Sequence, residues 1–198
     1  FLQMAIGWWD RWLKGIENGA EADPAYRAYI LHSEPPDASP AHRAGHWVAE
    51  SQWPSPRVTA EVLHLASGGA GVLHPPVHRS LEPMAKPMAY PAGYLEKRKP
   101  EAEFSLQVST PQTLGLEAGE FFPMGLNAEM PGDQAGDDAL SLCFDGEVLA
   151  EDLQLLGAAE VRLKLSSDKP LGFVVARLCD VAPDGASVRI AHGMLNLC

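Results

Sequence analysis

Apolar side chains at the start of the chain recur with the period of an α-helix, three or four positions apart. The positions that would share one face of this helix are Leu2, Ile6, Trp9, Leu13 and Ile16. We expect the helix to span residues 1–18, because Asn18–Gly19 suits the left-handed turn that ends many helices. Three tryptophans fall within it, and an apolar load of this size needs a partner surface outside the helix.

Beyond Pro24 the pattern changes to the alternation that is typical of β-strands. The clearest stretch is 159–166, where apolar and charged side chains alternate as in a half-exposed strand of an antiparallel sheet. A turn at Pro183-Asp184-Gly185 is expected to join the last two strands. The predicted strands are residues 26–31, 57–65, 104–109, 140–144, 159–166, 172–181 and 188–197.

Long irregular connections are predicted between these strands, at residues 33–56, 74–100 and 115–138, where proline, glycine and small polar residues are frequent. The whole chain holds 18 glycines and 17 prolines, which suits short strands joined by turns. Many strands and a single helix predict a mainly β fold, a β-sandwich or jelly roll.

The charge of the chain excludes two classes of partner. The formal net charge is −11 over 198 residues, so a phosphate backbone or an anionic membrane surface would be repelled. No apolar run approaches the length of a membrane span. We therefore expect neither a nucleic acid nor a membrane as a partner.

Three cysteines, Cys143, Cys179 and Cys198, show no CxxC spacing. Their odd number favours free thiols in a reducing compartment, which predicts a cytoplasmic protein. The chain opens within a helical pattern and ends within an alternating run at Met194–Cys198. We therefore expect it to be a piece of a longer protein that is truncated at the C-terminus.

Histidine pairs are the first candidates for chemistry. His42 and His46 stand four apart, as do His74 and His78, a spacing that on a helix could hold a metal ion. Prolines and glycine between or beside them disfavour a helix, so loop histidines are the favoured interpretation. The other histidines, His32, His64 and His192, belong to no motif.

Other candidates also have ordinary structural interpretations. The acidic group Asp133, Asp137 and Asp138 could bind a cation, but a loop whose carboxylates cap backbone N–H groups is favoured. The run 67–71 is expected to be a turn rather than a phosphate-binding loop. Four aromatic residues could line a ligand pocket or pack in a core or between domains, with packing favoured: Trp47, Trp53, Phe121 and Phe122. No catalytic, cofactor-binding or metal-binding residue is assigned, and no cofactor is expected.

Three segments resemble one family. Residues 8–19 (WWDRWLKGIENG) resemble the W-F-D-x-W-L-K-G-I-D-N-G segment of CocE/NonD hydrolases. Residues 131–142 resemble its P-x-D-Q-R-x-D-D-x-L-x-F stretch, with Ala135 where that family often has arginine. Residues 178–185 resemble its L-x-D-V-x-P-D-G turn, and 193–197 the x-G-x-L-N-L run that follows.

The resemblance implies a place in a larger enzyme. In this family an α/β-hydrolase domain carries the catalytic serine, aspartate and histidine, all upstream of the helix seen here. A C-terminal jelly roll of the galactose-binding type follows, the X-Pro dipeptidyl-peptidase C-terminal-like domain, which this chain resembles. The chain contains neither a G-x-S-x-G motif nor an HGGG segment, in agreement with this placement. The resemblance thus implies a linking helix at 1–24, a jelly roll at 25–198, and a non-catalytic domain that packs on the hydrolase domain and helps to shape its acyl pocket.

The parent enzyme would then act on ester or peptide bonds, as acyl esterases and Xaa-Pro dipeptidyl-peptidases do. Its substrate would be an acyl ester or a peptide, and the hydrolase domain of the same chain would be the partner of this domain. Two alternatives stay open. One is a carbohydrate- or ligand-binding jelly roll, and the other is a structural domain that forms homo-oligomers.

Overall fold

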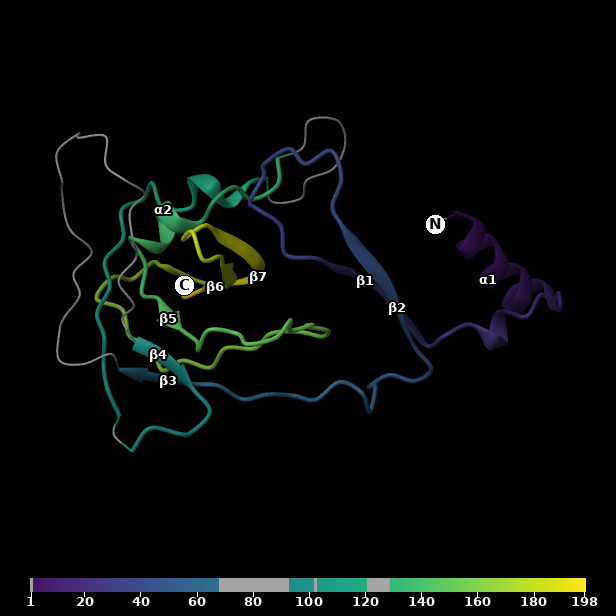
Figure 1. Cartoon of the computed structure of the whole chain (residues 1–198), viewed down its shortest axis with the longest axis horizontal. Helices are drawn as coiled ribbons and strands as arrows, with labels where there is room; N and C mark the ends of the chain where they lie inside the picture. The colour runs from purple at the N-terminus through teal and green to yellow at the C-terminus, as the bar shows by residue number, and fades with distance from the viewer. Residues whose placement is uncertain (1, 68–92, 102, 121–128) are drawn as a thin grey trace. The chain divides into compact units, whose positions relative to one another are not determined.

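The computed structural model describes residues 2–67, 93–101, 103–120 and 129–198 (Figure 1). These residues form a mainly β structure with few helices and small sheets. The elements in chain order are α1 (Leu2–Lys14), η1 (Ala20–Ala22), β1 (Tyr26–Leu31), β2 (Gly45–Glu50), β3 (His64–Ser67), β4 (Gly93–Glu96), η2 (Leu116–Ala118), α2 (Ala135–Asp138), β5 (Phe144–Asp145), β6 (Phe173–Val181) and β7 (Ser187–Asn196).

The chain divides into two compact units. The first unit joins Phe1–Leu31 with Gly45–Ala60, and it contains α1, η1 and the β1–β2 ladder. The second unit joins His32–Ala44 with Glu61–Cys198, and it contains the remaining elements.

The predicted N-terminal helix is confirmed as α1, but its predicted end was wrong. The helix ends at Lys14, where the N–H of Gly15 donates to the carbonyl oxygen of Arg11 at 3.2 Å. The Asn18–Gly19 pair lies beyond this end, and the Asn18 amide reaches back to donate to the carbonyl of Gly7 at 2.7 Å. Within the described parts of the chain, no helix is long and apolar enough to cross a membrane.

The predicted strand at 26–31 is confirmed as β1, and its partner β2 was missed. The two strands pair antiparallel from Tyr26 opposite Glu50 to Leu31 opposite Gly45. β2 falls within the segment 33–56, which was predicted to be irregular because prolines lie on both sides of its short alternating run. It is a strand because β1 pairs its backbone groups, and this pairing is not visible in local sequence.

A three-stranded sheet in the second unit corrects three further predictions. β3 and β4 pair antiparallel, and β4 pairs with β5 in parallel. Of the predicted strand 57–65 only the last two residues lie in β3, and of 140–144 only Phe144 lies in β5. β4 interrupts the predicted connection 74–100, of which residues 74–92 lie outside the described residues.

The hairpin of β6 and β7 confirms the predicted pair of strands at 172–181 and 188–197 (Figure 1). The turn at Pro183-Asp184-Gly185 joins them, with Gly185 at a φ of 85° that glycine adopts without steric cost. The N–H of Ala182 donates to the carbonyl of Ala186 at 2.8 Å and closes the turn. The ladder register shifts between Leu178 and Cys179, which marks a β-bulge.

The predicted strands at 104–109 and 159–166 were wrong. Both segments are irregular in the structure, and Val161, Leu163 and Leu165 of the alternating run are 43–53% exposed. Alternation gives a segment the side chains of a strand, but a strand also requires a neighbour that pairs its backbone groups. Among the described residues, neither segment has such a neighbour in a sheet.

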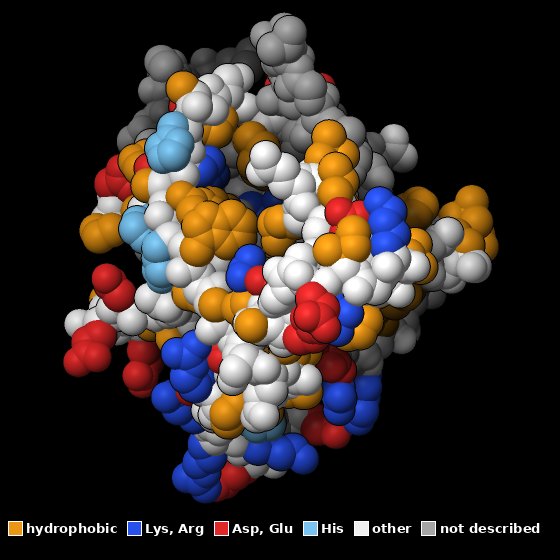
Figure 2. Space-filling view, turned by 90° about the vertical axis from the view of Figure 1, so that its right-hand side faces the viewer, with side chains coloured by type: hydrophobic (Ala, Val, Ile, Leu, Met, Phe, Trp, Pro, Cys, Tyr) orange, Lys and Arg blue, Asp and Glu red, His pale blue; other side chains and the backbone are white. Residues whose placement is uncertain are grey.

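Little apolar surface is buried in the described part of the chain. Its buried hydrophobic residues are Ala66, Ala135 and Ala186, all three small. Large apolar side chains lie at the surface instead, and Figure 2 shows hydrophobic groups among charged ones on one face of the molecule. Apolar surface of this extent favours association with further protein surface.

We expect a methyl group at Gly93 to disrupt the β3–β4–β5 sheet. A β-carbon there would lie 1.9 Å from the carbonyl oxygen of Ala66 and 2.9 Å from the ring of Phe144. Gly93→Ala should therefore lower the free energy of unfolding by about 1–3 kcal/mol in urea titrations, the usual cost of overpacking. The control is Gly146→Ala, where a β-carbon meets no atom within 4 Å. Equal stability of the two variants would contradict the close approach.

Candidate functional site

The best-connected polar cluster of the second unit surrounds Arg177 on β6. The guanidinium donates from Nη1 to Oε1 of Gln134 at 3.0 Å and from Nη2 to Oδ1 of Asp138 at 2.7 Å. Nη2 also lies 3.3 Å from Oγ of Ser141, and Nη1 lies 3.4 Å from Oδ2 of Asp137. These five residues are called the Arg177 cluster below.

Hydrogen bonds connect residues 133–138, which carry most of this cluster, to the start of β7. Oδ1 of Asp133 accepts from the backbone N–H groups of Ala135 and Ser187, both at 3.0 Å. The N–H of Gln134 donates to the carbonyl of Ser187 at 2.9 Å. Residues 133–138 are therefore fixed against the same hairpin that presents Arg177.

Gln134 and Asp137 also hold the loop around η2. Gln134 is fully buried, and its Nε2 donates to the carbonyls of Glu117 at 2.7 Å and Gly132 at 3.0 Å. Oδ1 of Asp137 accepts from the N–H of Gly115 at 3.0 Å. In its described residues, the segment 115–138, predicted to be irregular, contains two short helical turns, η2 and α2, that side-chain hydrogen bonds connect.

In the acidic group, the capping interpretation is confirmed for Asp133 and Asp137, whose carboxylates accept hydrogen bonds from backbone N–H groups. The carboxylate of Asp138 accepts from the guanidinium of Arg177 instead. Among the described residues, no group of three or more His, Cys, Asp or Glu is arranged to hold a metal ion.

The Arg177 cluster is well placed to stabilise a conformation. The side chains of Arg177, Asp137 and Asp138 are only 15%, 9% and 15% exposed, so their charges are largely removed from water. Charge-assisted hydrogen bonds are strong in such surroundings, and each charge is costly once its partner is lost. The donors and acceptors of the cluster are directed at one another. Their hydrogen bonds connect β6, residues 134–141 and the loop around η2, and the cluster presents no activated nucleophile.

Two thiols border this cluster. Burial, followed by the negative charge of Asp138, raises the pKa of the Cys143 thiol to about 12. Burial and Asp138 also raise the pKa of Cys179, whereas Cys198 is exposed. All three cysteines are free, as the sequence predicted.

We expect a single fast thiol in the native protein. At pH 8 a pKa of about 12 leaves roughly one Cys143 in ten thousand as the reactive thiolate. Iodoacetamide should therefore label Cys198 first and Cys143 at least about 100-fold more slowly, as followed by intact mass. The fast phase should disappear in Cys198→Ser, and its persistence in that variant would contradict the assignment.

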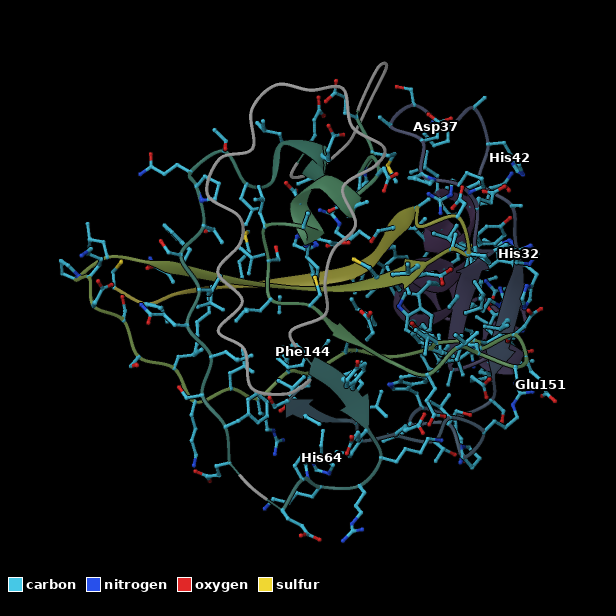
Figure 3. The ribbon with its side chains drawn as sticks, turned by 60° about the vertical axis from the view of Figure 1, so that its left-hand side comes forward. His32, Asp37, His42, His64, Phe144 and Glu151 are labelled. Atoms are coloured by element: carbon cyan, nitrogen blue, oxygen red, sulfur yellow. The ribbon has the colours of Figure 1, made fainter. Side chains whose placement is uncertain are left out.

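The described histidines of the second unit do not form one site. Figure 3 shows His32 and His42 well apart from His64. His46 lies on β2 and His192 on β7, while His74 and His78 lie outside the described residues. His42 lies in a loop, as predicted. The His42/His46 pair therefore lacks the helical spacing of a metal site.

The candidate aromatic residues are only partly described. Trp53 stacks on Tyr26 with ring centroids 4.4 Å apart, and Trp47 meets Tyr29 edge-on at 5.4 Å. Trp47 is nevertheless 72% exposed, so it lies at the surface of the first unit rather than in a core. Phe121 and Phe122 lie outside the described residues. Of the predicted turn 67–71, Ser67 ends β3 and the remainder also lies outside them.

The carboxylate of Glu50, at the end of β2, accepts hydrogen bonds from the loop that follows. Oε1 of Glu50 accepts from Nη2 of Arg57 at 2.6 Å, and Oε2 accepts from Nε of Arg57 at 3.1 Å and from Ser55 at 2.5 Å. Glu50 and Ser55 are buried. The hydrogen bonds from Arg57 and then Ser55 hold the pKa of Glu50 below its usual value of 4.5.

This lowered pKa predicts acid sensitivity of the first unit. The Glu50–Arg57 pairing stabilises the fold above about pH 4.5 and is lost as the pH falls through the lower folded pKa. The melting temperature of Glu50→Gln should therefore fall less than that of the wild type between pH 7 and pH 3. Glu103→Gln, which removes an exposed partner of Lys164, serves as the control with wild-type pH dependence. Identical pH profiles for all three proteins would refute the role of Glu50.

Sequence reasoning missed the residue at the centre of the main cluster. Arg177 was included only as part of a strand, and Gln134 only as part of a motif. A signal was present, because Arg177 is the one basic residue in the otherwise largely apolar run 172–181. A charge in a strand of that kind is usually paired when it is buried.

The described residues are mainly β, and within the second unit the Arg177 cluster connects β6 to residues 134–141. Over residues 18–198 the chain matches the family described as the X-Pro dipeptidyl-peptidase C-terminal non-catalytic domain. The chain belongs to this family, which confirms that its motifs indicated a non-catalytic C-terminal domain. The comparison with curated proteins gave no match, and the comparison with solved structures gave none.

Proposed function

We propose that this chain is the accessory domain of a serine hydrolase of the CocE/NonD type and packs on the α/β-hydrolase domain of the same parent chain. The observation that carries the proposal is the exposed apolar surface of α1. Trp8, Trp9 and Trp12 are 51%, 53% and 52% exposed, although tryptophan usually buries most of its area.

The polar contacts of α1 support this role, because they involve its charged residues and leave its apolar residues uncovered. Arg11 pairs with Glu21, and Lys14 pairs with Asp10 at 2.6 Å. Leu2 and Leu13 are each 73% exposed. A preformed helix with a large apolar surface suits a rigid docking element, since little conformational entropy remains to be lost on binding.

The family match begins at residue 18, after the last residue of α1. Because α1 lies outside the match, it suits a linking helix from the hydrolase domain. The proposed boundaries are 1–24 for this linking segment and 25–198 for a jelly-roll β-sandwich of the galactose-binding type. In the proposed role the sandwich stiffens the hydrolase domain and contributes to the wall of its acyl pocket. The substrate would be an acyl ester or a peptide.

A fluorophosphonate probe tests this proposal, because it marks activated serines. Intact mass should show one probe on the full-length parent protein and none on residues 1–198 alone. Labelling of the shorter chain would overturn the non-catalytic role, and an unlabelled parent would overturn the serine-hydrolase assignment. Removal of the domain should change the preference of the parent for acyl chain length, and an unchanged preference would overturn the role in the pocket.

A carbohydrate-binding module is the second candidate, and one observation favours it. Tyr29 and Trp47 are directly opposite on the β1–β2 ladder and share an exposed face, and exposed aromatic rings commonly stack on sugars. Titration of the chain with soluble polysaccharides, followed by tryptophan fluorescence, separates the candidates. Binding that Trp47→Ala abolishes would favour the module, and its absence would leave the accessory role.

A further inference from the structure

We draw no further inference here: the strongest candidate, the exposed apolar end of the β6–β7 ladder at Phe173, Val175 and Met194, is an unpartnered sheet face, and nothing in the structure shows what covers it.

Discussion

Replacement of Arg177 with methionine is expected to destabilise the second unit by about 3–5 kcal/mol, the usual cost of breaking a buried ion pair by removing one partner. Methionine keeps much of the side-chain volume but removes every donor. The carboxylates of Asp137 and Asp138 would then be left in largely dry surroundings without their cation, and Oε1 of Gln134 without its donor. Urea unfolding, followed by circular dichroism, measures this loss.

The control for Arg177 is Arg162→Met, which removes an exposed arginine paired with Glu160 at 2.6 Å. Because exposed ion pairs contribute little, this variant should stay within about 0.5 kcal/mol of the wild type. Arg177→Lys should lie between the two, since lysine keeps the charge but lacks the planar fork that reaches several acceptors. If Arg177→Met proves as stable as Arg162→Met, the Arg177 cluster does not hold the unit together.

The second large effect is expected on α1, and it rests on the proposed packing against the hydrolase domain. Trp9→Ala combined with Trp12→Ala should weaken binding of this chain to the separately produced hydrolase domain by about 30-fold or more. That factor corresponds to the roughly 2 kcal/mol or more that a single tryptophan at the centre of an interface contributes. Alanine favours helix, so α1 itself should persist. Isothermal titration calorimetry measures the affinity.

The matched control for α1 is Trp47→Ala, since this tryptophan is also exposed but lies on β2. It should leave the affinity within about threefold of the wild type, because in the proposed arrangement α1 provides the docking surface. Equal losses from both changes would indicate a general effect on folding. No loss from the α1 variant would show that these tryptophans lie outside the interface.

The helix and the hairpin could be predicted because each is specified locally. In α1 the apolar positions follow a 3.6-residue period, and in β6 and β7 two apolar runs flank a turn whose proline and glycine fix its geometry. Such elements depend on neighbours in sequence, so the chain alone contains the information. The end of α1 was misplaced because two glycine positions, Gly15 and Gly19, both suit a helix end.

The other strands depend on partners far along the chain. Gly45–Glu50 is a strand because β1 lies beside it, and Gly93–Glu96 because it lies between β3 and β5. Residues 159–166 show the reverse case, since a clear alternating pattern has no sheet partner among the described residues. Strand pairing links residues at long sequence separation, which local periodicity does not record.

The sequence by itself determined the family, the mainly β class, the N-terminal helix, the closing hairpin and the absence of a nucleophile-elbow motif, because each depends on residue types at short, fixed spacings. Only the tertiary structure decided which strands pair and what the acidic segment 133–138 does. The sequence left open that Asp137 and Asp138 bind a cation. In the folded chain, β6 brings the guanidinium of Arg177 within hydrogen-bonding distance of both carboxylates and of Gln134. The partner of a buried charge is set by packing between distant segments, and that packing exists only in the folded chain.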